Sequence, residues 1–377
     1  LKTQDPIKYD KLMDELQMNR LEVKERTNAG NNTAAITHVV PIVFHIIHDD
    51  SIGRIPESDI LETLNMLNED FSGLSPYINE IDSDFIALYG DIGFEFRFAQ
   101  LDPNGDCSNG INYYNDPDYA YGTIHDEPIP WVQSQWANPW AHNEYVNVFI
   151  ISDLGYAYAY FISTDNDYTG IVLDNEFVGE YGSGSPSTDN RSWITHEMGH
   201  FFGLDHTWGD GGDAGEVGNC SLDDGIADTP ETIGTYGCSL SQISCNSHDM
   251  VQNVMDYSEC GFFLTEGQKQ VMVAAMTSSA LNNMFSATNL ESAGVESPYT
   301  YAGINGCTTG IINTVAVDFN LYQNQAKEIV IQIQARIETV SVFDLQGKII
   351  YQGEVDQNKI KLNGEPQGVF LVKVVTT

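Results

Sequence analysis

The chain has 377 residues, of which 42% are hydrophobic, which is enough for one large globular domain and a smaller one. Its formal net charge of −38 comes from 54 acidic and 16 basic residues, and a surface of this charge excludes nucleic acid and anionic lipid as partners. We also expect no membrane insertion, because no apolar run approaches the roughly 20 residues that a membrane-spanning helix needs.

The N-terminal part of the sequence predicts a polar arm followed by a sheet-forming domain. Residues 1–37 are polar and poor in large apolar side chains, as in a terminal arm or the remainder of a pro-segment. Residues 38–48 alternate and then run apolar, which predicts a buried strand. In residues 56–71 apolar side chains recur at spacings of four and three, which predicts a helix with one apolar face. Two further strands, over 94–101 and 145–152, complete a predicted twisted sheet backed by helices.

Residues 196–206 read His-Glu-Met-Gly-His-Phe-Phe-Gly-Leu-Asp-His, which is H-E-x-x-H-x-x-G-x-x-H without a mismatch. His196 and His200 are one helical turn apart, so both imidazoles lie on the same face and can bind one zinc ion. Gly203 can take a positive φ that ends the helix and turns the chain back. His206 then reaches the same ion. Three imidazoles leave one coordination position open for water, as a catalytic zinc site requires.

The acidic residue inside this motif has the chemistry of a general base. Glu197 follows the first ligand in the chain, but on a helix it points off the metal. There it can hold the zinc-bound water and take its proton. A helix that carries histidines by chance is the alternative, and the extended pattern argues against it.

Residues 253–257 read Asn-Val-Met-Asp-Tyr, and a methionine turn is expected downstream of such a zinc motif. On these two motifs the chain resembles the pappalysin family of metzincin zinc endopeptidases, over roughly residues 38–285. The resemblance implies an α/β (α+β) catalytic domain at residues 38–286, with an upper twisted sheet and a lower helical subdomain. It also implies that Met255 forms a hydrophobic floor under the zinc and that Tyr257 hydrogen-bonds the tetrahedral intermediate.

The same resemblance predicts how the substrate and a second metal bind. It places an edge strand above the cleft at residues 155–161, where an extended substrate would add a strand. It implies a preference for a basic residue after the scissile bond, through Glu259. Residues 223–231 carry clustered carboxylates that suit Ca²⁺, and a solvated acidic loop is the alternative reading of that segment. The calcium ligands that the resemblance implies are Asp224, Asp228 and Thr229.

Six cysteines without a C-x-x-C pair argue against a second zinc site or a redox motif. Four of them lie between the zinc motif and the end of the methionine turn, and by sequence alone they permit three pairings. The resemblance implies the disulfides Cys220–Cys245 and Cys238–Cys260, which leaves Cys107 to pair with Cys307. Disulfides persist only in an oxidising compartment, so we expect the protein to be secreted or held at the cell surface.

The catalytic domain is predicted to end in a helix and a linker. Thr265 and Gln268 have the spacing of a capping box, which opens a helix predicted to run to about Met284. Residues 287–314 are rich in Ser, Gly, Thr and Asn, which predicts a linker.

Residues 315–377 predict a small C-terminal all-β sandwich of antiparallel strands. The expected strands are 329–333, 339–344, 348–352, 359–362 and 369–375. Residues 343–348 and 368–373 resemble the C-terminal sorting domains of type IX secretion, which implies that this secretion machinery is a partner. A generic carbohydrate- or surface-binding module is the alternative.

Together these features predict a secreted zinc-dependent endopeptidase, made as a zymogen, that hydrolyses peptide bonds of proteins. The expected cofactors are one catalytic zinc ion and structural calcium, and the expected partners are protein or peptide substrates. Two other functions remain open on the sequence: a zinc amidase that acts on small substrates, and an inactive surface adhesin in which zinc is structural.

Overall fold

The computed structural model describes residues 38–50, 52–73, 75–122, 140–159, 169–179, 188–209, 211–296 and 299, and the backbone of six strands between residues 320 and 376. The predictions for the arm at residues 1–37 and for Cys307 concern positions outside this set. The chain forms two compact units, Leu1–Thr308 and Thr309–Thr377.

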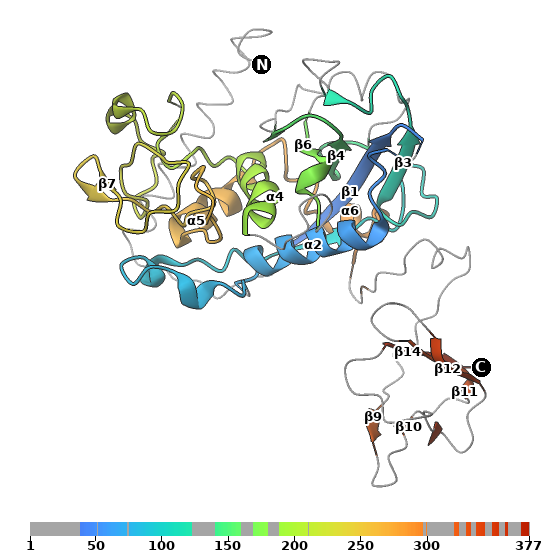
Figure 1. The fold of residues 1–377 in the computed structure, drawn as a ribbon. Coiled ribbons are helices and arrows are strands. Elements are labelled where there is room, and N and C mark those ends of the chain that lie inside the picture. The colour runs from blue at the N-terminus through green and yellow to red at the C-terminus, as the bar shows by residue number, and fades with distance from the viewer. Residues whose placement is uncertain are drawn as a thin grey trace. The chain divides into compact units, whose positions relative to one another are not determined.

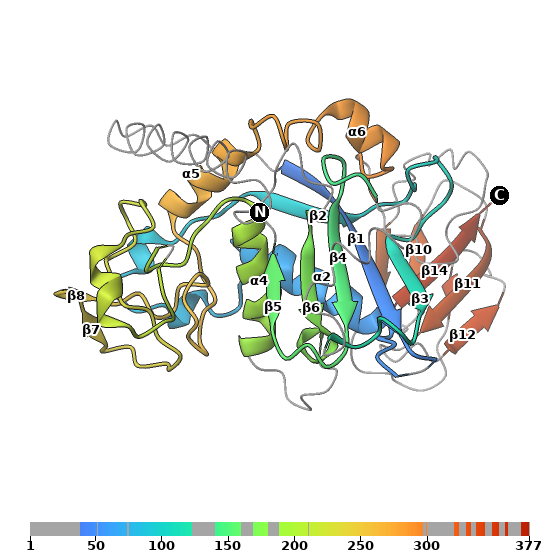
Figure 2. The same ribbon diagram turned by 90° about the horizontal axis from the view of Figure 1, so that it is seen from above.

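A six-stranded sheet is the centre of the first unit, with the order β2-β1-β4-β6-β5 and with β3 paired to the C-terminal half of β1. Its strands are β1 (His38–His48), β2 (Phe94–Phe98), β3 (Ile111–Asn115), β4 (Val146–Ile151), β5 (Ala157–Ala159) and β6 (Ile171–Asp174). The neighbouring strands run parallel, except that β5 is antiparallel to β6. β5 is therefore an edge strand, as Figure 2 shows.

β1 is buried on both faces of the sheet, which explains its almost continuous apolar sequence. Ile42 and Phe44 join the main hydrophobic cluster on one face. Val43 and Ile47 belong to two smaller clusters on the other face. A one-residue slip of this strand would exchange these two sets, so its register is fixed by packing.

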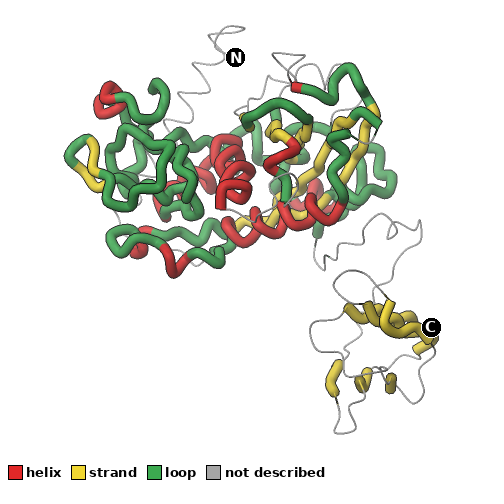
Figure 3. The backbone as a smooth tube through the Cα atoms, in the orientation of Figure 1, coloured by secondary structure: helices red, strands yellow, loops and turns green. Residues whose placement is uncertain are grey.

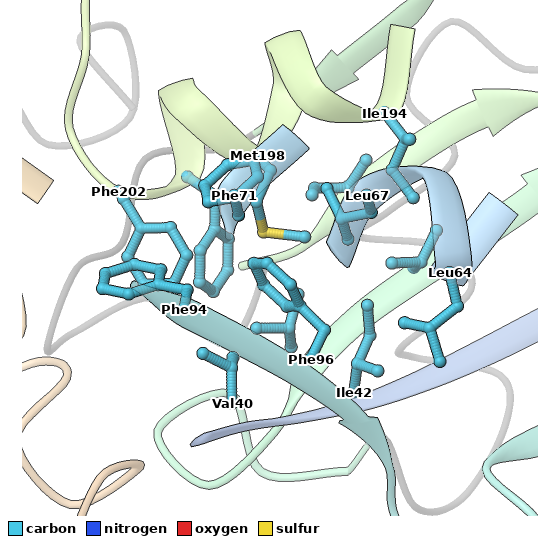
Figure 4. Packing of buried hydrophobic residues seen from close by; sticks show 14 of the residues in the cluster. Val40, Ile42, Leu64, Leu67, Phe71, Phe94, Phe96, Ile194, Met198 and Phe202 are labelled. Atoms are coloured by element: carbon cyan, nitrogen blue, oxygen red, sulfur yellow. The ribbon is translucent and has the colours of Figure 1, made fainter. Parts of the chain in front are cut away.

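Two helices cover the face of the sheet that carries the main cluster: α2 (Glu57–Phe71) and α4 (Thr188–Phe201). In Figure 4, Leu67 and Phe71 of α2 pack against Met198 of α4 and against Phe96 of β2. α4 runs between the sheet and the segment that contains β7 and β8, as Figures 1 and 2 both show. The sheet and this packing therefore fix the position of the helix that carries the zinc motif.

The segment 211–260 is built mostly from loops and turns, drawn in green in Figure 3. Its regular elements are the 3₁₀ turn η5 (Val217–Ser221) and a hairpin of β7 (Ile243–Ser244) and β8 (Ser247–His248). Short 3₁₀ turns elsewhere in the unit are η1 (Ile78–Glu80), η2 (Ile86–Leu88) and η4 (Asn175–Phe177).

The last helices of the first unit differ from the prediction at two points. α5 (Glu266–Ala275) opens with the expected capping box but ends at Ala275, short of Met284. The start of the predicted linker forms α6 (Ala287–Ser292), and Val295 after it is buried beside Tyr145. The catalytic unit therefore extends past residue 286. Of the helices described here, none has both the length and the apolar character needed to cross a bilayer.

The second unit contains two three-stranded antiparallel sheets, with the orders β13-β10-β9 and β12-β11-β14. Its strands are β9 (Asn320–Gln323), β10 (Ile329–Gln332), β11 (Ile337–Phe343), β12 (Ile349–Gly353), β13 (Lys359–Ile360) and β14 (Leu371–Thr376). Each of the five predicted strands overlaps one of these, and β9 is an addition.

Candidate active site

The three histidines of the zinc motif converge on one point. The Nε2 atoms of His196 and His200 are 3.0 Å apart, and those of His200 and His206 are 3.2 Å apart. His196 and His200 lie on α4. Gly203, with a φ of 90°, ends the helix so that the Leu204 N–H bonds the Gly199 carbonyl, a Schellman turn. This turn returns the chain, and with it His206, to the first two rings.

Hydrogen bonds on the far side of two of these rings prepare them to bind a metal. Nδ1–H of His196 donates to the Val254 carbonyl at 2.6 Å, and Nδ1–H of His200 donates to the Leu204 carbonyl at 2.7 Å. Each bond fixes the tautomer in which the Nε2 lone pair is free. Burial lowers the pKa of His196 to about 3 and also lowers that of His206, so these rings are neutral.

The donor set fits a tetrahedral zinc ion. Bonds of about 2.05 Å to zinc place two ligand nitrogens about 3.3 Å apart, close to the separations found here. Three neutral imidazole nitrogens at this spacing repel one another unless a cation lies between them. The residues present are therefore those that a zinc site with one open position needs.

His206 is held from behind by Trp208. The two rings stack with centroids 4.4 Å apart and an interplanar angle of 3°. Nε1–H of Trp208 donates to the Gly212 carbonyl, and a Cβ at Gly234 would collide with the indole. Because Trp208 is fully buried, the orientation of the third imidazole depends on this packing.

Glu197 lies in a cleft of about 230 Å³ together with the three histidines, Tyr257 and residues of β5. Its side chain is only 4% exposed. Burial raises the pKa of Glu197 to about 8, and a hydrogen bond from the backbone N–H of Ala159 offsets part of this shift. A carboxyl group whose pKa lies near neutral pH is suited to accept and return a proton.

Met255 packs against α4 at Gly199 and is fully buried. It approaches α4 so closely that a Cβ at Gly199 would collide with its Sδ. The Met255 carbonyl also accepts a hydrogen bond from the backbone N–H of Thr207, next to the third histidine. The methionine turn and the zinc motif are thus in direct contact.

Tyr257 lies beside the histidines and is 40% exposed. Its ring centroid is 4.7 Å from that of His206 and 5.5 Å from that of His196. Burial, followed by the charge of Glu197, raises the pKa of the phenol to about 12. The hydroxyl is therefore a hydrogen-bond donor at any pH near neutral.

Asp256 connects three segments around the site. Its carboxylate accepts from Thr207 Oγ1 at 3.1 Å and from the backbone N–H of Thr235 at 3.0 Å. The backbone N–H groups of Tyr257 and Ser258 also bond to it. Burial nevertheless raises the pKa of Asp256 to about 7, with these hydrogen bonds acting in the opposite direction.

A reciprocal amide pair joins the methionine turn to α5. Asn253 Nδ2–H donates to Gln268 Oε1 at 2.8 Å, and Gln268 Nε2–H donates to Asn253 Oδ1 at 2.9 Å. Gln268 Oε1 also accepts from the backbone N–H of Thr265, which completes the capping box. Both amides are fully buried, so the capping box and the turn form one network.

The structure pairs Cys220 with Cys245 and Cys238 with Cys260, as the resemblance implied. Cys107 is also disulfide-bonded. The two described bridges overlap along the sequence and cross-link the loops of residues 220–260, which include the methionine turn.

The remaining predicted site residues do not line the cleft. Asp224 accepts hydrogen bonds from Thr229 Oγ1 and from the Ile226 backbone, so these two predicted calcium ligands are adjacent. Asp228 instead bonds Thr265 Oγ1 and the Gly267 backbone, at the N-terminus of α5. Glu259 is exposed, two residues past Tyr257, and does not line the cleft.

Several residues that shape the site had no assigned role from the sequence. They are Gly199, Trp208, Asp256, Asn253 and Gln268. Gly199 stands at a variable position of the zinc motif, and only its contact with Met255 gives it a role. Gln268 was identified as part of a capping box, but its bond to Asn253 joins residues 15 apart and has no local signature.

Residues 133–277 match the model of the pregnancy-associated plasma protein-A peptidase family, and this range contains the histidine cluster and the methionine turn. An extracellular metalloprotease of Arthroderma otae is 27% identical over 249 residues, which are 63% of this chain and 76% of that protein. Another, from Sordaria macrospora, is 37% identical over 148 residues, 34% of this chain and 47% of that protein.

Solved structures give the same result for the fold. Mature mirolysin of Tannerella forsythia, in complex with a cleaved peptide, is similar with a TM-score of 0.60 and 28% identity, over 70% of this chain and 99% of mirolysin. A promirolysin mutant is similar with a TM-score of 0.63 and 26% identity, over 75% of this chain and 92% of that one. The mixed α/β fold with a mostly parallel sheet is the metzincin fold of mirolysin.

Proposed function

We infer that this metalloendopeptidase, which carries a pappalysin-like peptidase domain, binds its catalytic zinc through His196, His200 and His206 and uses Glu197 as its general base. The observation that carries the proposal is the cluster of three Nε2 atoms, 3.0 and 3.2 Å apart, in the cleft that also buries Glu197. Neutral imidazoles with fixed tautomers and a buried carboxyl group are what peptide hydrolysis requires.

Zinc held by these ligands supplies a Lewis acid for water and for the scissile carbonyl group. Glu197 takes a proton from the attacking water and returns it to the nitrogen of the leaving amine. The Ala159 N–H holds the carboxylate in place during both transfers. Since the cleft shields Glu197 from solvent, the proton stays with the reacting groups.

Tyr257 supports the carbonyl oxygen as it gains negative charge. Its hydroxyl is protonated and its ring lies against two of the zinc ligands. A donor that is already oriented before the reaction lowers the barrier without a cost of reorganisation.

We propose that the substrate binds extended along β5. Among the described strands β5 pairs only with β6, and its residues 157–159 line the cleft. The bond from the Ala159 N–H to Glu197 indicates that the other edge faces the catalytic groups. An extended peptide can add there as a strand through backbone hydrogen bonds, which supply affinity without reading the side chains.

The Glu197→Gln variant tests the assignment of the base. The amide keeps the size of the side chain but cannot accept the proton, so kcat/KM on a protein substrate should fall by about 10³-fold. Zinc content, measured on the same preparation, should equal that of the wild type. Equal cleavage by the wild type and the variant would exclude Glu197 as the base.

We propose a preference for a basic residue after the cleaved bond, through the exposed carboxylate of Glu259. Cut sites mapped by mass spectrometry in a digested proteome should then be enriched in Arg and Lys at that position. Glu259→Gln should reduce this enrichment by roughly 1.5–5-fold, as expected for loss of one exposed ion pair, and leave kcat on a neutral peptide unchanged. An unaltered profile would assign the preference elsewhere.

Calcium is proposed for the acidic loop on chemical grounds. Asp224 is buried, and Thr229 lies against it, so oxygen ligands are already gathered there. Asp228 caps α5 nearby in the sequence, and a calcium ion on this loop would steady the start of that helix.

We propose that the enzyme is secreted as a zymogen. The relatives in the comparisons are named as extracellular metalloproteases, promirolysin is a precursor form, and the two described disulfides need an oxidising compartment. Residues 1–37 would be the arm that is removed, residues from 38 the catalytic domain, and residues 315–377 a domain read by the type IX secretion machinery.

A further inference from the structure

Within the described part of the chain, a second group of metal-binding side chains lies apart from the cleft: Asp82, Asp84 and His248. One oxygen from each carboxylate and one ring nitrogen lie within 4.8 Å of one another. None of the three residues lines the catalytic cleft. Asp82 and Asp84 belong to the turn before η2, and His248 ends β8, so the group joins segments far apart in the sequence.

The His248 ring is held in the orientation of a metal ligand. Its Nε2–H donates to the Leu240 carbonyl at 2.6 Å, and its Nδ1 lies 3.0 Å from Asp84 Oδ2. His196 and His200 are held in the same manner, with one ring N–H on a backbone carbonyl and the other nitrogen directed at the ligand cluster. A carbonyl partner on one nitrogen leaves the lone pair on the other.

The carboxylates beside Nδ1 cannot complete this contact by themselves. An ionised carboxylate only accepts hydrogen bonds, so a bare Nδ1 at 3.0 Å from Asp84 needs either a proton or a cation between the two atoms. Asp82 is oriented by the Asp84 backbone N–H, which donates to Asp82 Oδ1 at 2.9 Å, and its own backbone N–H donates to Gln252.

We propose that Asp82, Asp84 and His248 bind a second zinc ion at the surface of the catalytic unit. An imidazole with two carboxylates suits zinc and similar borderline ions, whereas calcium takes oxygen ligands. The absence of C-x-x-C pairs argues only against a cysteine-bound site. Since the Asp84 side chain is 67% exposed, water completes the coordination and the ion exchanges with solvent, so it binds more weakly than the catalytic ion.

The ion would link two segments of the catalytic unit, the turn that carries Asp82 and Asp84 and the β7–β8 hairpin that carries His248. Asp82 and Asp84 precede Phe85, whose ring centroid is 5.0 Å from that of His248 and which belongs to a small hydrophobic cluster. On the other side, the β7–β8 hairpin is stapled by Cys245 to Cys220. A protonated His248 paired with Asp84 is the competing state, because the acceptors around the ring raise its pKa.

Zinc titration of the full chain at pH 8 tests this proposal. The titration starts from protein that already holds its catalytic zinc, and it contains an excess of Ca²⁺ to fill any site made only of oxygen ligands. Calorimetry should show one further equivalent of zinc. The Asp84→Asn and His248→Gln variants should bind this equivalent at least ten-fold more weakly. Asp118→Asn removes the same charge from an exposed position elsewhere and should bind like the wild type.

Uptake of only the catalytic ion by the wild type would overturn the proposal and leave an ordinary ion pair. So would a second ion that binds Asp84→Asn as tightly as the wild type. Asp84 is exposed, so its variant should fold, and zinc should raise the thermal midpoint of the wild type but not of Asp84→Asn. The experiment measures metal uptake and not activity. A failure of the proposed catalytic role of Glu197 would therefore leave this test of the second site unaffected.

Discussion

Tyr257 combines an exposed ring with a hydroxyl that resists ionisation. Burial and the charge of Glu197 raise its pKa to about 12, which extends the range of the protonated, donating form upward in pH. The Tyr257→Phe variant should therefore lose about 10²-fold in kcat, the usual effect of one lost oxyanion donor, with little change in KM.

The pH profile gives the control for this prediction. Because the phenol does not titrate between pH 6 and pH 9, wild type and Tyr257→Phe should show profiles of the same shape in that range. If activity falls at alkaline pH in the wild type but not in the variant, Tyr257 ionises within this range. Its pKa would then not be raised as its burial beside Glu197 implies.

At the scale of residues, the sequence predicted that His196, His200 and His206 converge, because this cluster depends on local geometry. One helical turn relates His196 to His200, and a single glycine in the left-handed region brings in His206. The residues that hold these ligands in place were not predictable in the same way. Trp208 holds His206 by stacking on it, and its own position depends on the close approach of Gly234, which is 26 residues further along the chain.

At the scale of elements, the methionine turn depends on α5. Gln268→Ala would remove the oxygen acceptor of two buried donors, the Asn253 Nδ2–H group and the Thr265 N–H group, while Asn253 Oδ1 would keep its bond from the Met255 N–H. We expect a loss of about 3 kcal/mol in the free energy of unfolding, from two unsatisfied groups, together with weaker zinc binding. Denaturant unfolding and a zinc competition assay would measure the two effects.

Gln270→Ala on the same helix is the matched control, since Gln270 is partly exposed and makes neither of these bonds. It should cost less than about 1 kcal/mol. If the two variants are equally stable, the amide pair does not hold the turn.

The elements that were predicted least well are those whose ends depend on side-chain hydrogen bonds. α5 stops at Ala275 because a Thr-Ser-Ser run follows Met276, and Thr277 Oγ1 bonds the Ala274 carbonyl in place of continuing the helix. α6 begins where Ser286 caps the Asn289 N–H, within a segment whose polar composition resembled a linker. Asn289 also bonds the Glu144 carbonyl, a contact that composition cannot reveal.

At the scale of the whole molecule, the proposed catalytic residues belong to one compact unit and the C-terminal strands β9–β14 to the other. Every residue assigned to catalysis lies in Leu1–Thr308. A chain that ends at Thr308 should retain its thermal midpoint and its kcat/KM on a soluble peptide within about two-fold, because a domain with its own core folds alone. A large loss of either would show that the two units stabilise one another.

The overlap of the two bridges Cys220–Cys245 and Cys238–Cys260 makes the segment around the methionine turn dependent on oxidation. Cys260 follows Tyr257 by three residues, so the Cys238–Cys260 bridge tethers the segment that carries this tyrosine. Under reducing conditions the chain would carry its histidines without these two bridges. If the enzyme is exported as proposed, oxidation of the four thiols outside the cell would also be the step that completes its cleft.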